Sequence, residues 1–292
     1  MTNCGTGSES CCTSLEVPGA SYDRTYTYGN ASTYANPASV SDFRMDKYLV
    51  TVGRFRQFVN AWTGGYVPPA LSGKHTHLNG GQGLANSGSA GTYEPGWITS
   101  DDGNVAPTND NLACAAGYQT WTNAAGSQEN LPINCVNWWE SYAFCIWDGG
   151  FLPSEAEWEY AAAGGSQQRE YPWGTTAPGA GNLYAIYACD YASDGGTCTG
   201  VTNVAPVGTP TLGAGLWGQL DLAGDVAEWN LDWLGSYVDP CVDCAYFTST
   251  TDRTARGGDF LSGSSFVQPP SRDGDMPSTR AESIGLRCAR TP

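Results

Sequence analysis

The sequence predicts a single loop-rich domain that combines α-helices with β-strands. Its 292 residues are 40% hydrophobic and include 11 Trp and 16 Tyr, which is enough apolar side chain for a sizeable core. The 38 Gly and 17 Pro residues punctuate the chain, and long helical periodicities are rare. These features favour an α+β domain over a helical bundle.

The charge balance restricts the partners that the surface can bind. The chain has 13 Lys and Arg against 29 Asp and Glu, a formal net charge of −16. Such a surface repels nucleic acid and anionic membranes, and it attracts divalent cations or basic partners. No apolar run reaches the ~18 residues that a membrane span requires. We therefore expect a protein that neither binds nucleic acid nor spans a membrane.

Eleven cysteines indicate an oxidising compartment. Cys189 with Cys198 and Cys241 with Cys244 form close pairs, and each predicts a small disulfide loop. Zinc is the competing interpretation of the second pair, but a second CxxC or a histidine pair at zinc-finger spacing is missing. Residues 1–30 lack the apolar core of a signal peptide, so we expect a secreted or cell-surface protein whose leader precedes this numbering. The odd count leaves at least one thiol unpaired or intermolecular.

The first elements follow from local patterns. Residues 1–43 carry three cysteines and are expected to form a disulfide-stapled extension with a strand or two. Residues 45–51 predict a strand, after which Thr51 caps a helix. The apolar residues of that helix fall on one face: Val52, Phe55, Val59 and Trp62.

The segment 64–131 is the least periodic part of the chain. It is dense in Gly, Asn, Ser and Pro, so we expect an insertion of long surface loops, where function is often carried. It also contains both histidines, His75 and His77, which point the same way on an extended chain and could share a metal. No third ligand can be named, and a solvated loop is the favoured interpretation.

Two helices are predicted after residue 134. Asn137 with Glu140, and Ser154 with Glu157, form capping-box patterns at their starts. Glycine pairs at 149–150 and 164–165 end them. The acids at 155, 157 and 159 are interpreted as structural partners of the helix dipole rather than as an acid/base pair.

The segment 215–233, GLWGQLDLAGDVAEWNLDW, fits neither helical nor strand periodicity cleanly. It places carboxylates at Asp221, Asp225 and Glu228 around an Ala-Gly turn, a pattern that suits a hard cation such as calcium. The alternative is a helix that starts at Val226, with Asp225 as its N-cap and Glu228 at its third position. The two interpretations are compatible with each other.

Four motifs that occur in order resemble the formylglycine-generating enzyme, or sulfatase-modifying factor, family. They are LPSEAEWEY at 152–160, DLAGDVAEW at 221–229, Arg256-Gly-Gly and IGLRC at 284–288. The resemblance covers roughly Met45–Arg290, and it implies the family's variant of the C-type lectin fold over residues 44–292, with residues 64–131 as an insertion.

The resemblance also implies calcium sites and one disulfide. The family's second calcium site maps onto Asp221, the carbonyls of Gly224 and Val226, and Glu228. Its other site maps onto Asn182 and Leu183, but the later acid falls near Thr199, so that Asp194 would have to substitute from a loop. One or two calcium ions are therefore expected. The family's core disulfide corresponds to Cys145 and Cys288.

The chemistry of the active family members does not carry over. They hold Cu(I) with two cysteines after the Arg-Gly-Gly motif, and this sequence has Ser262 and Val267 at those positions. A serine hydroxyl is a poor ligand for soft Cu(I), and valine offers none. We expect no copper and no copper oxidase activity.

Three functions remain open from the sequence. The favoured one is a secreted, non-catalytic binding or structural protein, with a groove between the 257–280 loop and the 64–131 insertion for a small molecule, glycan, peptide or protein. The second is an enzyme of different chemistry that uses Arg256, Asp259 and Arg272, with a metal on the histidines. The third is a self-assembling extracellular component that uses the stapled extension and the unpaired cysteine. The residues expected to line the groove are Asp259, Phe260, Ser262, Arg272 and Arg280.

Overall fold

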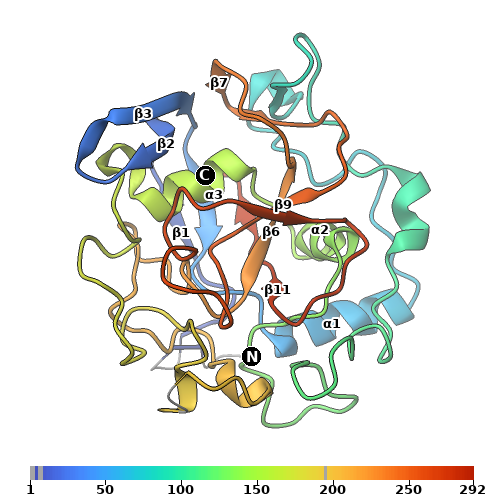
Figure 1. Cartoon of the computed structure of the whole chain (residues 1–292). Coiled ribbons are helices and arrows are strands. Elements are labelled where there is room, and N and C mark those ends of the chain that lie inside the picture. The colour runs from blue at the N-terminus through green and yellow to red at the C-terminus, as the bar shows by residue number, and fades with distance from the viewer. Residues whose placement is uncertain (1–3, 6–8, 194–195) are drawn as a thin grey trace.

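The computed structural model describes residues 4–5, 9–193 and 196–292. This part of the chain forms one loop-rich domain of mixed α and β structure, in which short helices and strands are joined by long loops (Figure 1). No helix among these residues is both long enough and apolar enough to cross a bilayer.

The three α-helices begin where the sequence predicts. Helix α1 (Val52–Thr63) is capped by Thr51, whose side chain accepts a hydrogen bond from the Arg54 amide. Helices α2 (Trp138–Trp147) and α3 (Glu155–Ala163) both start with the complete capping boxes expected of Asn137 and Ser154. Gly164 ends α3 in the left-handed conformation. Helix α3 is buried on every side, which explains why its sequence shows no amphipathic stripe.

A four-stranded sheet, ordered β10-β9-β6-β11, carries the central motifs (Figure 1). Its strands are β6 (Ala227–Trp233), β9 (Arg253–Arg256), β10 (Asp273–Asp275) and β11 (Ile284–Gly285). Strand β6 runs antiparallel to β9 and parallel to β11. The alternative helix from Val226 is wrong, because Asp225 adopts φ +66° in a turn and Glu228 then pairs with Arg256 across the strands.

A second sheet, ordered β1-β4-β12, joins the two ends of the described chain. Its strands are β1 (Ser14–Val17), β4 (Phe43–Asp46) and β12 (Ala289–Arg290). Strand β4 is shorter than the strand predicted over residues 45–51. The chain bends at residues 47–48, and the Asp46 carboxylate before the bend pairs with Arg54 of α1 at 2.9 Å.

The remaining strands fasten the outer loops to the domain. Strands β2 (Ser21–Thr27) and β3 (Asn30–Ser39) form an antiparallel hairpin, and β7 (Cys241–Val242) pairs in parallel with β3. Strand β5 (Ala85–Asn86) pairs in parallel with β8 (Cys244–Ala245). Five short 3-10 helices occur in the described loops: η1 (Asn79–Gly81), η2 (Thr99–Asn104), η3 (Gly165–Gln167), η4 (Tyr191–Ser193) and η5 (Val201–Asn203).

The expectation that residues 64–131 are surface loops is wrong for their buried half. Trp97 is 1% exposed and packs in the same cluster as α1 and α2. Five further buried apolar side chains of the segment belong to that cluster, because the short helices alone cannot close the core: Leu78, Leu84, Val105, Leu112 and Trp121.

Five disulfides staple the described residues. The pairs Cys145–Cys288, Cys189–Cys198 and Cys241–Cys244 are the three that the sequence predicts. Cys4–Cys11 and Cys114–Cys135 complete the set, so that Cys12 is unpaired and exposed. The Cys145–Cys288 bond closes the longest loop, with a sequence separation of 143 residues, and ties α2 to the C-terminal strands.

Candidate functional site

The loop after β9 is built on a buried arginine. Arg256 is 1% exposed and forms ion pairs of 2.8 Å with Glu155 and 2.9 Å with Glu159, both from α3. Its Nη1 also donates to the carbonyl oxygens of Pro269 and Ser271, at 2.8 and 3.1 Å. The arginine of the Arg-Gly-Gly motif therefore holds the far side of its own loop in place.

A second arginine shares the same carboxylate. The Nε of Arg272 lies 2.6 Å from Glu155, and its guanidinium lies 4.1 Å from the ring centre of Tyr237. Burial alone would raise the pKa of Glu155, but the charges of Arg256 and Arg272 hold that pKa below its usual value. Burial raises the pKa of Glu159 to about 8 against the charge of Arg256. Glu155 and Glu159 therefore have a structural role, as buried partners of ion pairs.

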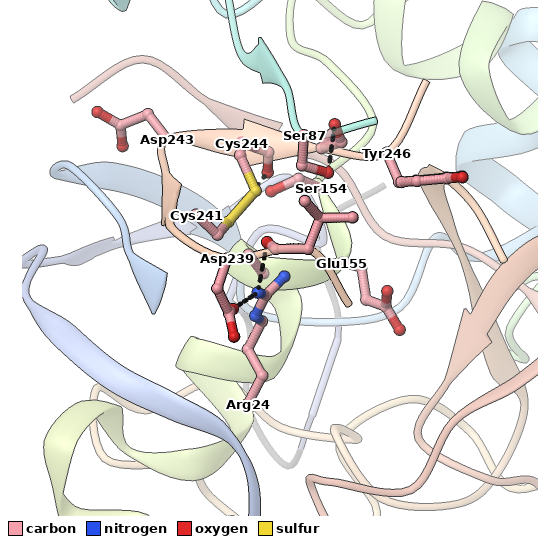
Figure 2. The surroundings of a disulfide bond; sticks show 12 residues. Arg24, Ser87, Ser154, Glu155, Asp239, Cys241, Asp243, Cys244 and Tyr246 are labelled. Carbon is pink, nitrogen blue, oxygen red and sulfur yellow. Dashed lines mark hydrogen bonds and ion pairs between the residues drawn. A yellow bond between two sulfur atoms is a disulfide. The ribbon is translucent and has the colours of Figure 1, made fainter. Parts of the chain in front are cut away.

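Figure 2 shows how the edge of this cluster is fastened. The Cys241–Cys244 disulfide lies beside the ion pair of Arg24 and Asp239, whose atoms are 2.8 Å apart. The Arg24 guanidinium also lies 4.4 Å from the ring centre of Tyr237. The stapled extension thus contacts the same tyrosine as the loop after β9.

Three of the five residues predicted to line a ligand groove surround a small hollow whose lining includes no residue of the 64–131 segment. A hollow lined by Asp259, Ser262 and Arg272 has a volume of about 20 Å³, which is room for about one water molecule. Phe260 is fully buried in a hydrophobic cluster rather than facing a ligand. Arg280 pairs through both Nη atoms with Glu140 at 2.5 Å and does not line this hollow. The structure therefore corrects two of the five groove residues.

The two positions that correspond to the copper thiolates hold no soft ligand. Val267 is 1% exposed and packs against Tyr171, Ala185 and Ala223. Ser262 is half-buried, and its backbone amide donates to Asp259 at 2.9 Å. Every cysteine except Cys12 is in a disulfide, so these residues do not fit Cu(I).

The turn of the predicted calcium site is present, but the Glu228 carboxylate is already bonded to other side chains. The chain passes Gly224 with φ +79°, where a Cβ would come within 2.0 Å of the Ile186 carbonyl oxygen. Glu228 is fully engaged, by Arg287 at 2.6 and 2.8 Å and by the indole of Trp158 at 2.8 Å. A cation at Glu228 would face the Arg287 charge, so Glu228 does not fit the role that the resemblance implies.

Two neighbouring carboxylates do have free oxygens. Asp221 accepts a hydrogen bond from the Gly208 amide, and Asp225 accepts one from the Ala205 amide. The other oxygen of each is buried and has no hydrogen-bond partner among the residues that the structure describes. Burial raises the pKa of Asp221 to about 6, and burial together with the Asp221 charge raises that of Asp225 well above its usual value. Val226 supplies a buried side chain to the core beside them.

The other predicted calcium site is less complete. Asn182 donates to the Asp190 carbonyl oxygen, and its buried side-chain oxygen has no partner within the described ranges of the chain. The Leu183 carbonyl accepts from the Leu212 amide, and its side chain is exposed. Asp194 lies outside the described residues. No group of three or more His, Cys, Asp or Glu side chains that could hold a metal occurs in the part of the chain that the structure describes.

His75 occupies a buried site and His77 is half-buried, so that the pair does not lie in a solvated loop. His75 is fully buried, with Nδ1 3.0 Å from Glu94 and Nε2 3.0 Å from Glu157. His77 lies 6.2 Å from His75 between ring centres and stacks near Phe151. Both His75 nitrogens are used by carboxylates, which leaves none for a metal. The sequence gives no sign of this, since Glu157 is 82 residues away.

The structure contains a larger hollow that the sequence does not indicate. It has a volume of about 150 Å³ and lies between the β2–β3 hairpin and the loop after β9. No motif marks it, because its walls come from three distant segments. Its lining residues are Tyr26, Thr27, Tyr28, Glu170, Gln268 and Pro270.

Comparisons with known proteins agree with the motif resemblance. Residues 7–292 match a family model described as the sulfatase-modifying factor enzyme 1-like domain. The formylglycine-generating enzyme of Mus musculus is 29% identical over 272 residues, which cover 87% of this chain and 68% of that protein. Inactive C-alpha-formylglycine-generating enzyme 2 of Bos taurus is 31% identical over 176 residues, covering 56% and 52%. The structure of PvdO from Pseudomonas aeruginosa superposes with a TM-score of 0.63 at 20% identity and covers 96% of this chain and 94% of that one.

Proposed function

Because the chain belongs to the sulfatase-modifying factor enzyme 1-like family, we propose that it is a secreted, ligand-binding member that lacks the family's copper oxidase chemistry. The observation that carries this proposal is the pair Ser262 and Val267 at the positions of the two copper thiolates. Oxygen activation by Cu(I) in this family requires both soft ligands. The relative from Bos taurus that is named inactive supports the idea that members without this activity occur.

The burial of Val267 strengthens the argument. A cysteine at this position would replace the isopropyl side chain of Val267, which packs in a hydrophobic cluster with Tyr171, Ala185 and Ala223. Cys12, the one unpaired cysteine, belongs to the N-terminal extension and is exposed. The preceding residue, Cys11, forms a disulfide with Cys4, so that this part of the extension is not linked to the loop after β9. No second thiol is therefore available for a two-coordinate Cu(I) site.

The proposal also includes secretion of the protein and binding of calcium. Five disulfides are stable in an oxidising compartment and are rare in reducing ones, which supports an extracellular or cell-surface location. A hard divalent cation such as calcium would be held by the free oxygens of Asp221 and Asp225, since carboxylate oxygens are the ligands that calcium prefers. It would neutralise two buried carboxylates that have no cationic side chain as a direct partner.

The enzyme alternative has less support. Arg256 and Arg272 both pair with Glu155, and His75 pairs with Glu94 and Glu157. These groups are already neutralised within the protein, which leaves no free anion clamp or metal site for the chemistry considered from the sequence.

The copper proposal is tested with purified protein and a double variant. The wild type should take up no Cu(I) from a chromophoric chelator and should form no aldehyde on a cysteine-containing peptide. The variant Ser262→Cys/Val267→Cys restores both thiols and serves as the matched control, and it should compete for Cu(I). Stoichiometric copper uptake or aldehyde formation by the wild type would overturn the proposal.

Self-association is a second candidate function, favoured by the exposed thiol of Cys12. A disulfide between two copies would appear as a dimer on a non-reducing gel, and it should disappear in Cys12→Ser. A monomer in both proteins under oxidising conditions would exclude this route to assembly.

A further inference from the structure

We propose that the hollow beside the β2–β3 hairpin binds one ring of a neutral saccharide or amino sugar. This site differs from the small hollow after β9, and it names a ligand class within the proposed binding function. The cavity of about 150 Å³ matches the size of cavity that holds a single six-membered ring. Its lining is not that of an apolar pocket, because it includes a carboxylate, an amide and a hydroxyl: Glu170, Gln268 and Thr27.

One wall of the hollow is a rigid part of the hairpin. Tyr26 is 6% exposed, and its hydroxyl donates to the Arg169 carbonyl oxygen at 2.8 Å. This bond places the residue after Arg169, Glu170, beside the hairpin. Tyr26 also packs edge-on against Tyr34, with ring centres 6.1 Å apart. The wall is therefore fixed before any ligand arrives, which limits the entropy lost on binding.

The opposite wall is fixed by the buried arginine. Arg256 donates to the carbonyl oxygens of Pro269 and Ser271, on either side of Pro270. The Ser271 amide donates in turn to the Gln268 carbonyl, which closes a turn between them. Gln268 and Pro270 are thereby held over the hollow by the ion-pair cluster of α3.

The polar groups in the hollow are available for a ligand. The Glu170 carboxylate and the Gln268 amide are half-buried, and neither has a hydrogen-bond or ion-pair partner among the residues that the structure describes. A half-buried carboxylate without a partner gains free energy when it accepts hydrogen bonds from hydroxyl groups. An amide can both donate to and accept from neighbouring hydroxyls. Together they match the edge of a sugar ring.

The aromatic surface completes the match. Tyr28 is 46% exposed at the hairpin turn, and its ring can pack against the apolar face of a ligand. Tyr26 is 6% exposed and cannot do so. A sugar ring presents one such face of C–H groups and a polar edge. A cage for a quaternary ammonium would instead need several exposed rings around one point. The carboxylate and the net charge of −16 exclude sugar acids as favoured ligands.

The test is a titration of the whole protein with a panel of monosaccharides. Saturation-transfer NMR and calorimetry are run with methyl glucoside, methyl galactoside, methyl mannoside, N-acetylglucosamine and glucuronate, and with tetramethylammonium as a cationic probe. We expect saturable binding of at least one neutral or amino sugar and none of glucuronate. Glu170→Gln should weaken that binding about ten-fold or more, as expected for a lost charge-assisted contact. Tyr28→Ala should weaken it several-fold, because the ring that packs on the apolar face of the sugar is lost.

Matched variants separate a local effect from a general one. Tyr93→Ala removes a comparably exposed tyrosine that does not line the hollow, and Glu282→Gln removes one charge elsewhere. Both should bind like the wild type. Loss of sugar binding in the controls as well, no binding across the panel, or binding of tetramethylammonium alone would each overturn the inference. Such a failure would leave the copper result untouched, so the two proposals fail independently.

Discussion

The imidazole of His75 lies 3.0 Å from the carboxylate of Glu157, and this contact joins the long 64–131 segment to the first turn of α3. On its other side the ring meets Glu94 at 3.0 Å, from the same segment. Burial opposes a charge at this position, but the two carboxylates outweigh burial and raise the pKa of His75 to about 10. A charged histidine between two acids thus fastens the segment to the domain.

The stability of the protein should fall as the pH rises from about 6.5 to about 10. The folded pKa of His75 is raised, so its contribution is fully present below the unfolded value of 6.5 and is lost as the pH passes through about 10. His75→Gln should lower the free energy of unfolding by ~3–5 kcal/mol at pH 6, since it leaves buried acids without their cation. Urea unfolding at pH 6, 8 and 10 measures this loss, which should shrink at the highest pH.

His77→Gln is the control for this prediction. His77 is half-buried, and burial lowers its pKa, so it carries no charge near neutral pH. Its replacement should change stability far less than the loss of His75. Equal losses for the two variants, at every pH, would contradict the role given to His75.

Removing the Cys145–Cys288 disulfide should destabilise the protein more than removing Cys241–Cys244. The first bond closes a loop of 143 residues and the second a loop of three. Loop-closure entropy gives about 5 kcal/mol for the first and about 2 kcal/mol for the second. Thermal unfolding of the Cys145→Ala/Cys288→Ala and Cys241→Ala/Cys244→Ala variants compares them. The reverse order would show that strain or native packing, rather than loop length, determines how much stability each disulfide contributes.

Replacing Arg256 by alanine should cost about 3–5 kcal/mol of unfolding free energy. It leaves Glu159 without its ion pair and frees the carbonyls of Pro269 and Ser271. Arg44→Ala is the matched control, because Arg44 pairs with the exposed Glu16 at the surface and should contribute about 1 kcal/mol or less. Chemical unfolding measures both variants. Similar losses for the two arginines would rule out the buried cluster as the support of the loop.

Calcium should raise the thermal unfolding midpoint, and a chelator should lower it. At 100 times its Kd, a bound ion contributes about 2.7 kcal/mol. Asp221→Asn/Asp225→Asn should remove this response, since both free carboxylate oxygens are lost. Glu228→Gln should destabilise the protein with or without calcium, because Glu228 is the ion-pair partner of the buried Arg287. A calcium response that persists in the double aspartate variant would place the ion elsewhere.

Local signals made several features predictable. The capping residues at 51, 137 and 154 indicate helix starts, because each contacts a residue only three positions later in the chain. The structure has helices at all three places. Close cysteine pairs likewise indicate short disulfide loops. The family motifs add the long Cys145–Cys288 bond.

The features that the sequence does not predict depend on contacts between residues that lie far apart in the chain. The strand at β6 follows from the left-handed Asp225 and from pairing with β9, neither of which a local pattern reveals. The sequence predicts a solvated loop at His75 because the two acids that surround it lie 19 and 82 residues away in the chain. It predicts a groove position for Phe260 because only the folded chain shows the cluster that covers this side chain.

The sheet β1-β4-β12 has a consequence for the order in which the chain can fold. Strand β4 has β1 on one side and β12, nearly 250 residues later, on the other. While a ribosome extends the chain, this sheet keeps an open edge until residues 289–290 have been made. The Arg287 that neutralises Glu228 and the Cys288 that pairs with Cys145 arrive in the same late stretch. The sheet, the ion pair of Glu228 and the long disulfide can therefore form only after residues 287–290 have been made, however early the helices form.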